Sequence, residues 1–104
     1  MSWVILFLAG IFEISWAIGL KYSSGFSKFW PSLFTVVSMI VSMVLLSIAV
    51  KNIPIGTGYA IWTGIGAVGT AILGIFLFNE PSELPRLFYI LLIIIGIAGL
   101  KIYS

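Results

Sequence analysis

Four long apolar blocks, separated only by short polar segments, constrain the fold of this chain more than any other feature. The blocks run over approximately residues 3–20, 31–50, 56–78 and 86–103. Each is close to the roughly 20 residues that a helix needs to cross the hydrocarbon of a bilayer. Backbone polar groups inside a bilayer must be paired within the segment itself, which favours helices over irregular structure. The sequence therefore predicts an all-α membrane protein, with residues 1–104 forming a single domain of four transmembrane helices.

The composition excludes a water-soluble domain. Hydrophobic residues make up 62% of the chain and charged residues 8%, with a mean hydropathy of +1.27, whereas soluble domains contain about 25% charged residues. The first block lacks a preceding basic segment and contains an acidic residue, so we interpret it as a retained helix and not as a cleaved signal peptide. A multi-pass membrane protein is expected.

Several function classes are also disfavoured. The chain contains no cysteine and no histidine, which excludes disulfides, thiol chemistry and the common zinc sites. We therefore expect no metal and no other cofactor. The net charge of +2 comes from scattered cations that form no basic patch, so a nucleic-acid partner is not expected. An enzyme is the least favoured class, because the sequence offers no nucleophile–base pair.

The loop charges bear on orientation. In a four-helix topology one side of the membrane holds Lys51 and Lys101, and the other holds Lys21, Lys28 and Arg86. Two cations against three is almost no bias under the positive-inside rule. The balance favours insertion in both orientations and hence an antiparallel homodimer, with a site where the two protomers meet.

Glu13 is the first candidate site residue. It is the only acidic residue before position 80, and ten residues beyond Trp3 it lies roughly 15 Å deep, near the midplane. Gly10 and Trp16 share its helix face. A carboxyl group at that depth is costly and marks a functional site by default. It could instead stay protonated and only hydrogen-bond a neighbouring helix. The functional interpretation is a site that exchanges a proton for a cation.

The second block carries a polar stripe formed by Thr35, Ser38 and Ser42, at steps of three and four residues. Hydroxyl groups there could hydrogen-bond Glu13 or a ligand. The alternative is that they join helices or bond back to their own helix carbonyls. For Ser42 the two interpretations are evenly balanced.

In the third block, Tyr59, Trp62, Thr63 and Gly66 share a face. Aromatic rings attract cations through their quadrupole, and the tyrosine hydroxyl adds a polar group, although these rings could also serve packing alone. Gly64, Gly66 and the glycine at position 69 match G-x-G-x-x-G, but a dinucleotide site needs a strand before this motif. We expect these glycines to permit close helix contact and a hinge in the third helix.

The fourth block and the loop before it carry weaker signals. Gly96 and Gly99 form a small-residue surface suited to helix packing. Lys101 is expected either to extend to the lipid headgroups or to have a second role. Glu80 and Glu83, beside Arg86, are interpreted as a solvated turn with little chemistry.

Three segments together resemble the small multidrug resistance family over essentially the whole chain. They are GIFEISWAIGLKYSSGF at residues 10–26, PIGTGYAIWTGIGAVG at 54–69 and GIAGLK at 96–101. More narrowly, the chain is similar to the guanidinium-exporter branch, because a tryptophan stands three residues after the acid and a lysine closes the fourth block. The quaternary-ammonium branch has a small hydroxyl residue in place of Trp16 and lacks that lysine.

The resemblance implies an antiparallel, dual-topology homodimer that exports guanidinium across the bacterial inner membrane in exchange for protons. It implies that Glu13 is the carboxylate shared by proton and substrate. The other residues that match the family's site are Gly10, Trp16, Ser42, Tyr59 and Trp62. Three alternatives stay open: an exporter of quaternary ammonium or other lipophilic cations, a small dual-topology ion channel, and a membrane subunit that transports nothing.

Overall fold

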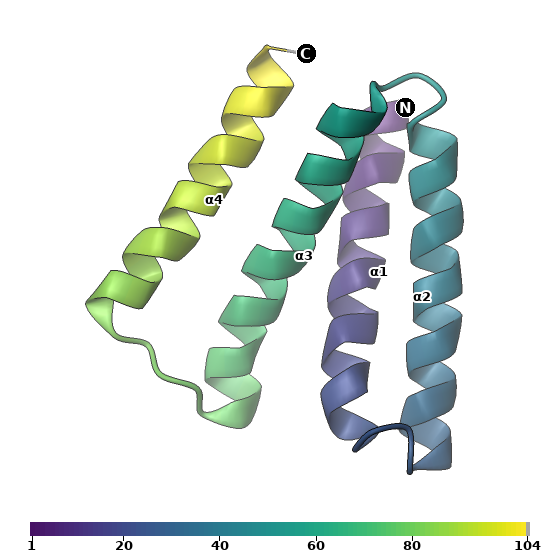
Figure 1. Cartoon of the computed structure of the whole chain (residues 1–104), viewed down its shortest axis with the longest axis vertical. Helices are drawn as coiled ribbons and strands as arrows, with labels where there is room; N and C mark the ends of the chain where they lie inside the picture. The colour runs from purple at the N-terminus through teal and green to yellow at the C-terminus, as the bar shows by residue number, and fades with distance from the viewer. Residues whose placement is uncertain (104) are drawn as a thin grey trace.

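The computed structural model describes residues 1–103 as four helices joined by short loops (Figure 1). They are α1 (Ser2–Tyr22), α2 (Phe29–Ala49), α3 (Ile55–Phe78) and α4 (Leu84–Ile102). All four are long and apolar enough to cross a membrane. The prediction of an all-helical chain with four membrane-spanning segments is thereby confirmed.

Three helix ends lie two residues from their predicted positions. α2 begins at Phe29 and not at Pro31, so Pro31 falls within its first turn, where a missing N–H costs nothing. The other two differences have physical reasons as well. α1 continues through Lys21 and Tyr22, because a cation in the last turn is favourable at the negative end of the helix dipole. α4 begins at Leu84, two residues before Arg86, because Pro85 falls within the first turn, where a missing N–H costs nothing. The extension of α1 brings the Lys21 side chain beside the cavity described below.

The four helices form a thin layer of 40 × 35 × 17 Å. In this layer α1 lies between α2 and α3, and α4 stands at the outer edge against α3 (Figure 1). The N-terminus and the end of α4 lie at the same end of the layer (Figure 1). Because α1 is central, its side chains reach both neighbouring helices, and Glu13 belongs to this helix.

The hydrophobic core lies at the end of the layer where α1 and α3 begin and α2 ends. Its buried members come from those three helices and the loop between α2 and α3: Leu6, Ala9, Leu46, Ala49, Ile53, Ile61 and Trp62. The opposite half of the α1–α3 contact contains a cavity.

α4 contributes little to this core. Ile90 is its one buried residue within the described range, and its leucines and isoleucines are mostly exposed. A Cβ built at Gly96 or Gly99 would meet no atom within 4 Å. The predicted small-residue surface is therefore present, but within residues 1–103 no other helix packs on it.

The end of α3 fixes the direction of the next loop. Asn79 adopts the left-handed conformation, with φ 54° and ψ 35°, which asparagine tolerates better than most residues. The backbone N–H of Glu80 then donates to the Gly74 carbonyl oxygen at 3.3 Å. This turn directs the Glu80 side chain back over α3.

Candidate functional site

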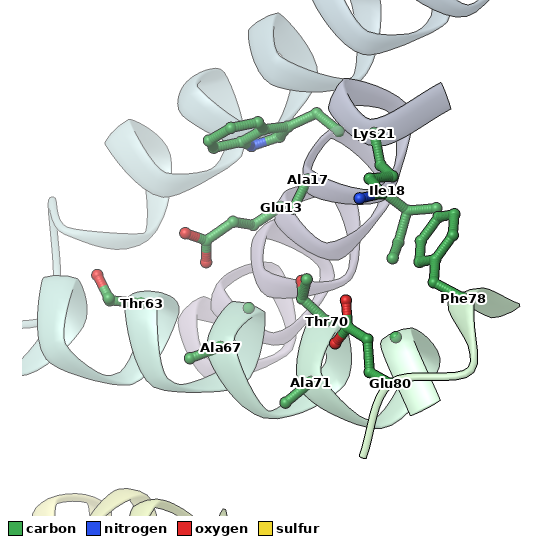
Figure 2. Close-up of a pocket in the computed structure, with 13 residues that line it drawn as sticks. Glu13, Ala17, Ile18, Lys21, Thr63, Ala67, Thr70, Ala71, Phe78 and Glu80 are labelled. Atoms are coloured by element: carbon green, nitrogen blue, oxygen red, sulfur yellow. The ribbon is translucent and has the colours of Figure 1, made fainter. Parts of the chain in front are cut away.

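A cavity of about 520 Å³ lies between α1 and α3 (Figure 2). This volume is in the range of small-molecule sites. Its wall comes from the second half of α1, from the face of α3 opposite, and from the loop after α3. The residues that line it are Glu13, Trp16, Ala17, Ile18, Lys21, Thr63, Gly66, Ala67, Thr70, Ala71, Gly74, Phe78 and Glu80.

Glu13 extends from α1 toward α3 and into the cavity (Figure 2). It fits there because α3 has a glycine at the point of contact: a Cβ built at Gly66 would collide with the Glu13 carboxyl group. The missing side chain of Gly66 therefore provides the space for this carboxyl. The close contact predicted for Gly64 and Gly66 is present. α3 is one unbroken helix through both glycines, and the hinge between two states stays a prediction.

Three polar side-chain atoms of the cavity wall are buried without a hydrogen-bond partner among residues 1–103. They are Glu13 Oε1, Trp16 Nε1 and Thr70 Oγ1. Buried polar atoms are nearly always paired, and leaving one unpaired costs about 1–3 kcal/mol. Two of the three atoms can accept a hydrogen bond, and the indole N–H can only donate. The cavity is thus suited to a polar ligand rich in N–H donors.

Charged and aromatic side chains gather at one end of the cavity (Figure 2). The Lys21 ammonium lies 5.8 Å from the centroid of the Phe78 ring, and Tyr22 packs on that ring with centroids 5.2 Å apart. Glu80 Oε1 lies 3.4 Å from an Arg86 guanidinium nitrogen. We refer to this end, formed by Lys21, Phe78 and Glu80, as the cavity mouth.

Ser42 lies away from the cavity, in the contact between three helices. Its hydroxyl donates to the Ala9 carbonyl oxygen of α1 at 2.7 Å and accepts from Trp62 Nε1 of α3 at 2.9 Å. Both Ser42 and Trp62 are buried. In this protomer Ser42 therefore joins helices, and the hydrogen bond to Glu13 that the sequence suggested is not formed.

The remaining predicted site residues have different surroundings. Tyr59 is 55% exposed, and its ring lies 5.5 Å from that of Trp62. Gly10 is buried beneath Ile65, and Gly64 faces Ile97 of α4. Of the predicted binding residues, the protomer brings only Glu13 and Trp16 to the cavity.

The predictions for Lys101, near the end of α4, and for the polar stripe on α2 can also be compared with the structure. The Lys101 ammonium lies 5.0 Å from the centroid of the Trp3 ring, so this side chain folds onto α1 at one end of the layer. Thr35 and Ser38 are buried, and the Thr35 hydroxyl donates to the Pro31 carbonyl at 2.8 Å. Thr35 therefore bonds back to its own helix, as the alternative interpretation of the stripe has it.

Three cavity residues were not predicted from the sequence: Thr70, Lys21 and Glu80. A signal existed for Thr70, because it follows Gly66 by four residues and so lies on the same helix face. For Glu80 the sequence indicates only a solvated turn, whereas the structure places its carboxyl over Gly74 in the cavity wall. Its position depends on the left-handed Asn79 and is not visible in composition or periodicity.

The amino-acid sequence matches a known protein family. Residues 1–93 match the family described as Small Multidrug Resistance protein. The chain belongs to the small multidrug resistance family. With four spanning helices it is a multi-pass protein of the bacterial inner membrane.

Relatives named as guanidinium exporters match between 98% and 100% of this chain. It is 58% identical over 104 residues to a guanidinium exporter of Proteus vulgaris, with both chains covered completely. It is 57% identical over 102 residues to a guanidinium exporter of Escherichia coli (strain K12), covering 98% of this chain and 97% of the relative. A guanidinium exporter of Yersinia pestis is 57% identical, with both chains covered completely.

Proposed function

We propose that this protein exports guanidinium in exchange for protons, and that the two cations compete for Glu13. It acts as a transporter and not as an enzyme. The observation that carries the proposal is the Glu13 carboxyl group in the cavity, where Oε1 has no hydrogen-bond partner in the described chain. The guanidinium exporters that match along the whole chain support the choice of substrate.

The chemistry of the ligand fits the wall of the cavity. Guanidinium is planar and carries only N–H donors, as the arginine head group does, and a carboxylate can meet it with two parallel hydrogen bonds. The Thr70 hydroxyl offers a further acceptor. The Trp16 ring lines the same cavity and can hold a cation against its face.

Coupling follows from the fact that one carboxyl group serves both cations. When Glu13 carries a proton, it has lost the charge that attracts guanidinium. When guanidinium is bound, the ion pair opposes protonation. Each cation therefore leaves before the other binds, and alternate exposure of Glu13 to the two membrane faces converts a proton gradient into guanidinium export.

The active unit is an antiparallel homodimer, whose two protomers are inserted in the membrane in opposite orientations. Support comes from the near balance of the loop cations and from α4, whose apolar side chains and glycines are left exposed by the protomer. A second, inverted copy packed on this layer would bring two Glu13 carboxyls into one shared site.

Proton-driven transport in liposomes tests this function. Purified protein is reconstituted, a proton gradient is imposed, and uptake of radiolabelled guanidinium is compared between the wild type and Glu13→Gln. We expect uptake in the wild type and a loss of roughly 100-fold or more in the variant, because removing one partner of a buried ion pair costs about 3–5 kcal/mol. Glu83→Gln removes an exposed loop carboxylate outside the cavity and serves as the matched control.

Three results would contradict the proposal. Equal uptake by the wild type and Glu13→Gln would remove the acid from the mechanism. Uptake of tetraethylammonium in preference to guanidinium would favour the quaternary-ammonium alternative. Guanidinium flux that is unaffected by the proton gradient would favour a channel.

A further inference from the structure

Two carboxyl groups lie over one face of α3. Gly66, Thr70 and Gly74 follow at four-residue steps on that face. A Cβ built at Gly66 would collide with the Glu13 carboxyl, and one built at Gly74 would collide with the Glu80 carboxyl. Eight helical residues span roughly 12 Å. The cavity therefore has one carboxyl group at its mouth and a second one toward its opposite end, both placed by missing side chains on the same helix.

Thr70 lies halfway between these two contacts. Its hydroxyl lines the cavity and is buried without a hydrogen-bond partner in the described chain. Each step, from Gly74 to Thr70 and from Thr70 to Gly66, is four residues, or roughly 6 Å along the helix. A small cation that moves along this face would meet an acceptor oxygen at the mouth, at the midpoint and at Glu13.

The present partner of Glu80 is itself a guanidinium group. Arg86 contacts Glu80 Oε1 through one nitrogen at 3.4 Å, and the two side chains are 43% and 39% exposed. A pair that is this long and this exposed contributes little to stability. A free guanidinium ion could therefore replace the arginine side chain without a large loss.

We propose that Glu80 is an outer binding site for guanidinium at the cavity mouth, where the ion displaces Arg86 before it passes Thr70 to reach Glu13. This inference rests on the proposed function and adds an entry site to it. Arg86 acts as a tethered competitor: while it occupies Glu80, the mouth carries the charges of Lys21 and Arg86 against one carboxylate, and a cation is disfavoured. When Arg86 moves away, the carboxylate can bind the incoming ion.

The test measures the initial rate of proton-driven guanidinium uptake against guanidinium concentration in proteoliposomes. For Glu80→Gln we expect KM to rise about threefold, the size of an exposed ion pair, with the maximal rate nearly unchanged. Glu80→Asp should restore KM toward the wild-type value. Glu83→Gln makes the same charge change in the same loop, outside the cavity, and should leave KM unaltered.

Arg86→Gln separates this role from a structural one. If Glu80 is an outer site, removing its competitor should lower KM about twofold to threefold, opposite to the effect of Glu80→Gln. If the pair only anchors the loop, both variants should change KM in the same direction, and that result would overturn the proposal.

The outcome also distinguishes this inference from the function on which it rests. Wild-type protein without proton-driven guanidinium uptake would defeat both. Wild-type uptake together with equal KM values for Glu80→Gln and Glu83→Gln would defeat the outer site alone.

Discussion

At the scale of single residues, the site depends as much on missing side chains as on chemical groups. Glu13 reaches across to α3 because Gly66 has no Cβ, and Glu80 folds over α3 because Gly74 has none. Thr70 stands between them on the same face with an unpaired hydroxyl. The pattern of glycines on α3 thus decides where carboxylates can lie in the cavity.

Gly66→Ala tests this dependence. The added methyl group would collide with the Glu13 carboxyl, so we expect guanidinium uptake to fall at least tenfold, the equivalent of about 1.4 kcal/mol, while the protein still folds. Gly56→Ala is the matched control, because a Cβ there meets no atom within 4 Å and the residue lies on the same helix. Equal uptake by the two variants would show that Glu13 does not need this space.

A second residue-scale prediction concerns the midpoint of the cavity. Thr70→Val keeps the shape of the side chain and removes the unpaired hydroxyl. If guanidinium uses this acceptor, the uptake rate should fall about threefold to tenfold, in line with about 1 kcal/mol for one hydrogen bond. Thr70→Ser should retain the rate. A higher rate in Thr70→Val than in the wild type would contradict the role assigned to the hydroxyl.

The sequence predicted the chemistry of the site better than its geometry. Glu13 and Trp16 could be placed together because three-residue spacing on one helix is a local property. The surroundings of Ser42 could not be predicted, since periodicity shows which face of α2 is polar but not which helix that face meets. In the structure this face meets the backbone of α1 at Ala9, and the Ser42 hydroxyl donates a hydrogen bond to the Ala9 carbonyl oxygen.

At the scale of helices, α1 is held between its neighbours by hydrogen bonds as well as by packing. The Ser42 hydroxyl links the Ala9 carbonyl of α1 to the Trp62 indole of α3, at the end of the layer where the core lies. The other half of α1, which carries Glu13, borders the cavity instead. At one end, hydrogen bonds through Ser42 connect α1 to α3. At the other end, the cavity leaves room for a ligand between the two helices.

Ser42→Ala should therefore act on stability. It leaves the buried Trp62 N–H and the Ala9 carbonyl without this partner, and we expect the free energy of unfolding to fall by about 1–2 kcal/mol. Thermal unfolding in detergent measures the change. Ser47→Ala, which removes an exposed hydroxyl on the same helix, should have little effect. An unchanged Tm for Ser42→Ala, together with a raised KM for guanidinium, would instead support the interpretation of Ser42 as a ligand-binding residue.

The helices themselves were predictable because a bilayer requires a fixed length of apolar chain. The loop after α3 was not, since it depends on one residue: Asn79 in the left-handed conformation turns the chain so that Glu80 lies over Gly74. A carboxylate in a polar loop with two prolines gives no sign of such a turn. The sequence also does not show that Gly74 provides the space for the Glu80 carboxyl, because this contact is visible only in the structure.

At the scale of the whole molecule, the protomer is a layer only 17 Å thick, with α4 exposed at its edge (Figure 1). Two cations at one end of the helices and three at the other leave the orientation of the chain in the membrane nearly unbiased. We predict that single cysteines introduced at Ser27 and at Asn52, on opposite sides, are each labelled from both faces of the membrane in comparable fractions. The native chain has no cysteine, so the labelling has no background. Labelling of each position from one face alone would exclude dual topology.

If proton and guanidinium compete for the Glu13 carboxyl group, guanidinium that binds to the protonated protein must release the proton. This release can be measured directly. Guanidinium is added to detergent-solubilised protein in weakly buffered solution, and the change in pH is recorded near neutrality. We expect wild-type protein to release protons in a saturable manner and Glu13→Gln to release none, while Glu83→Gln behaves as the wild type. Saturable guanidinium binding without proton release, or equal release by Glu13→Gln, would contradict the competition for Glu13.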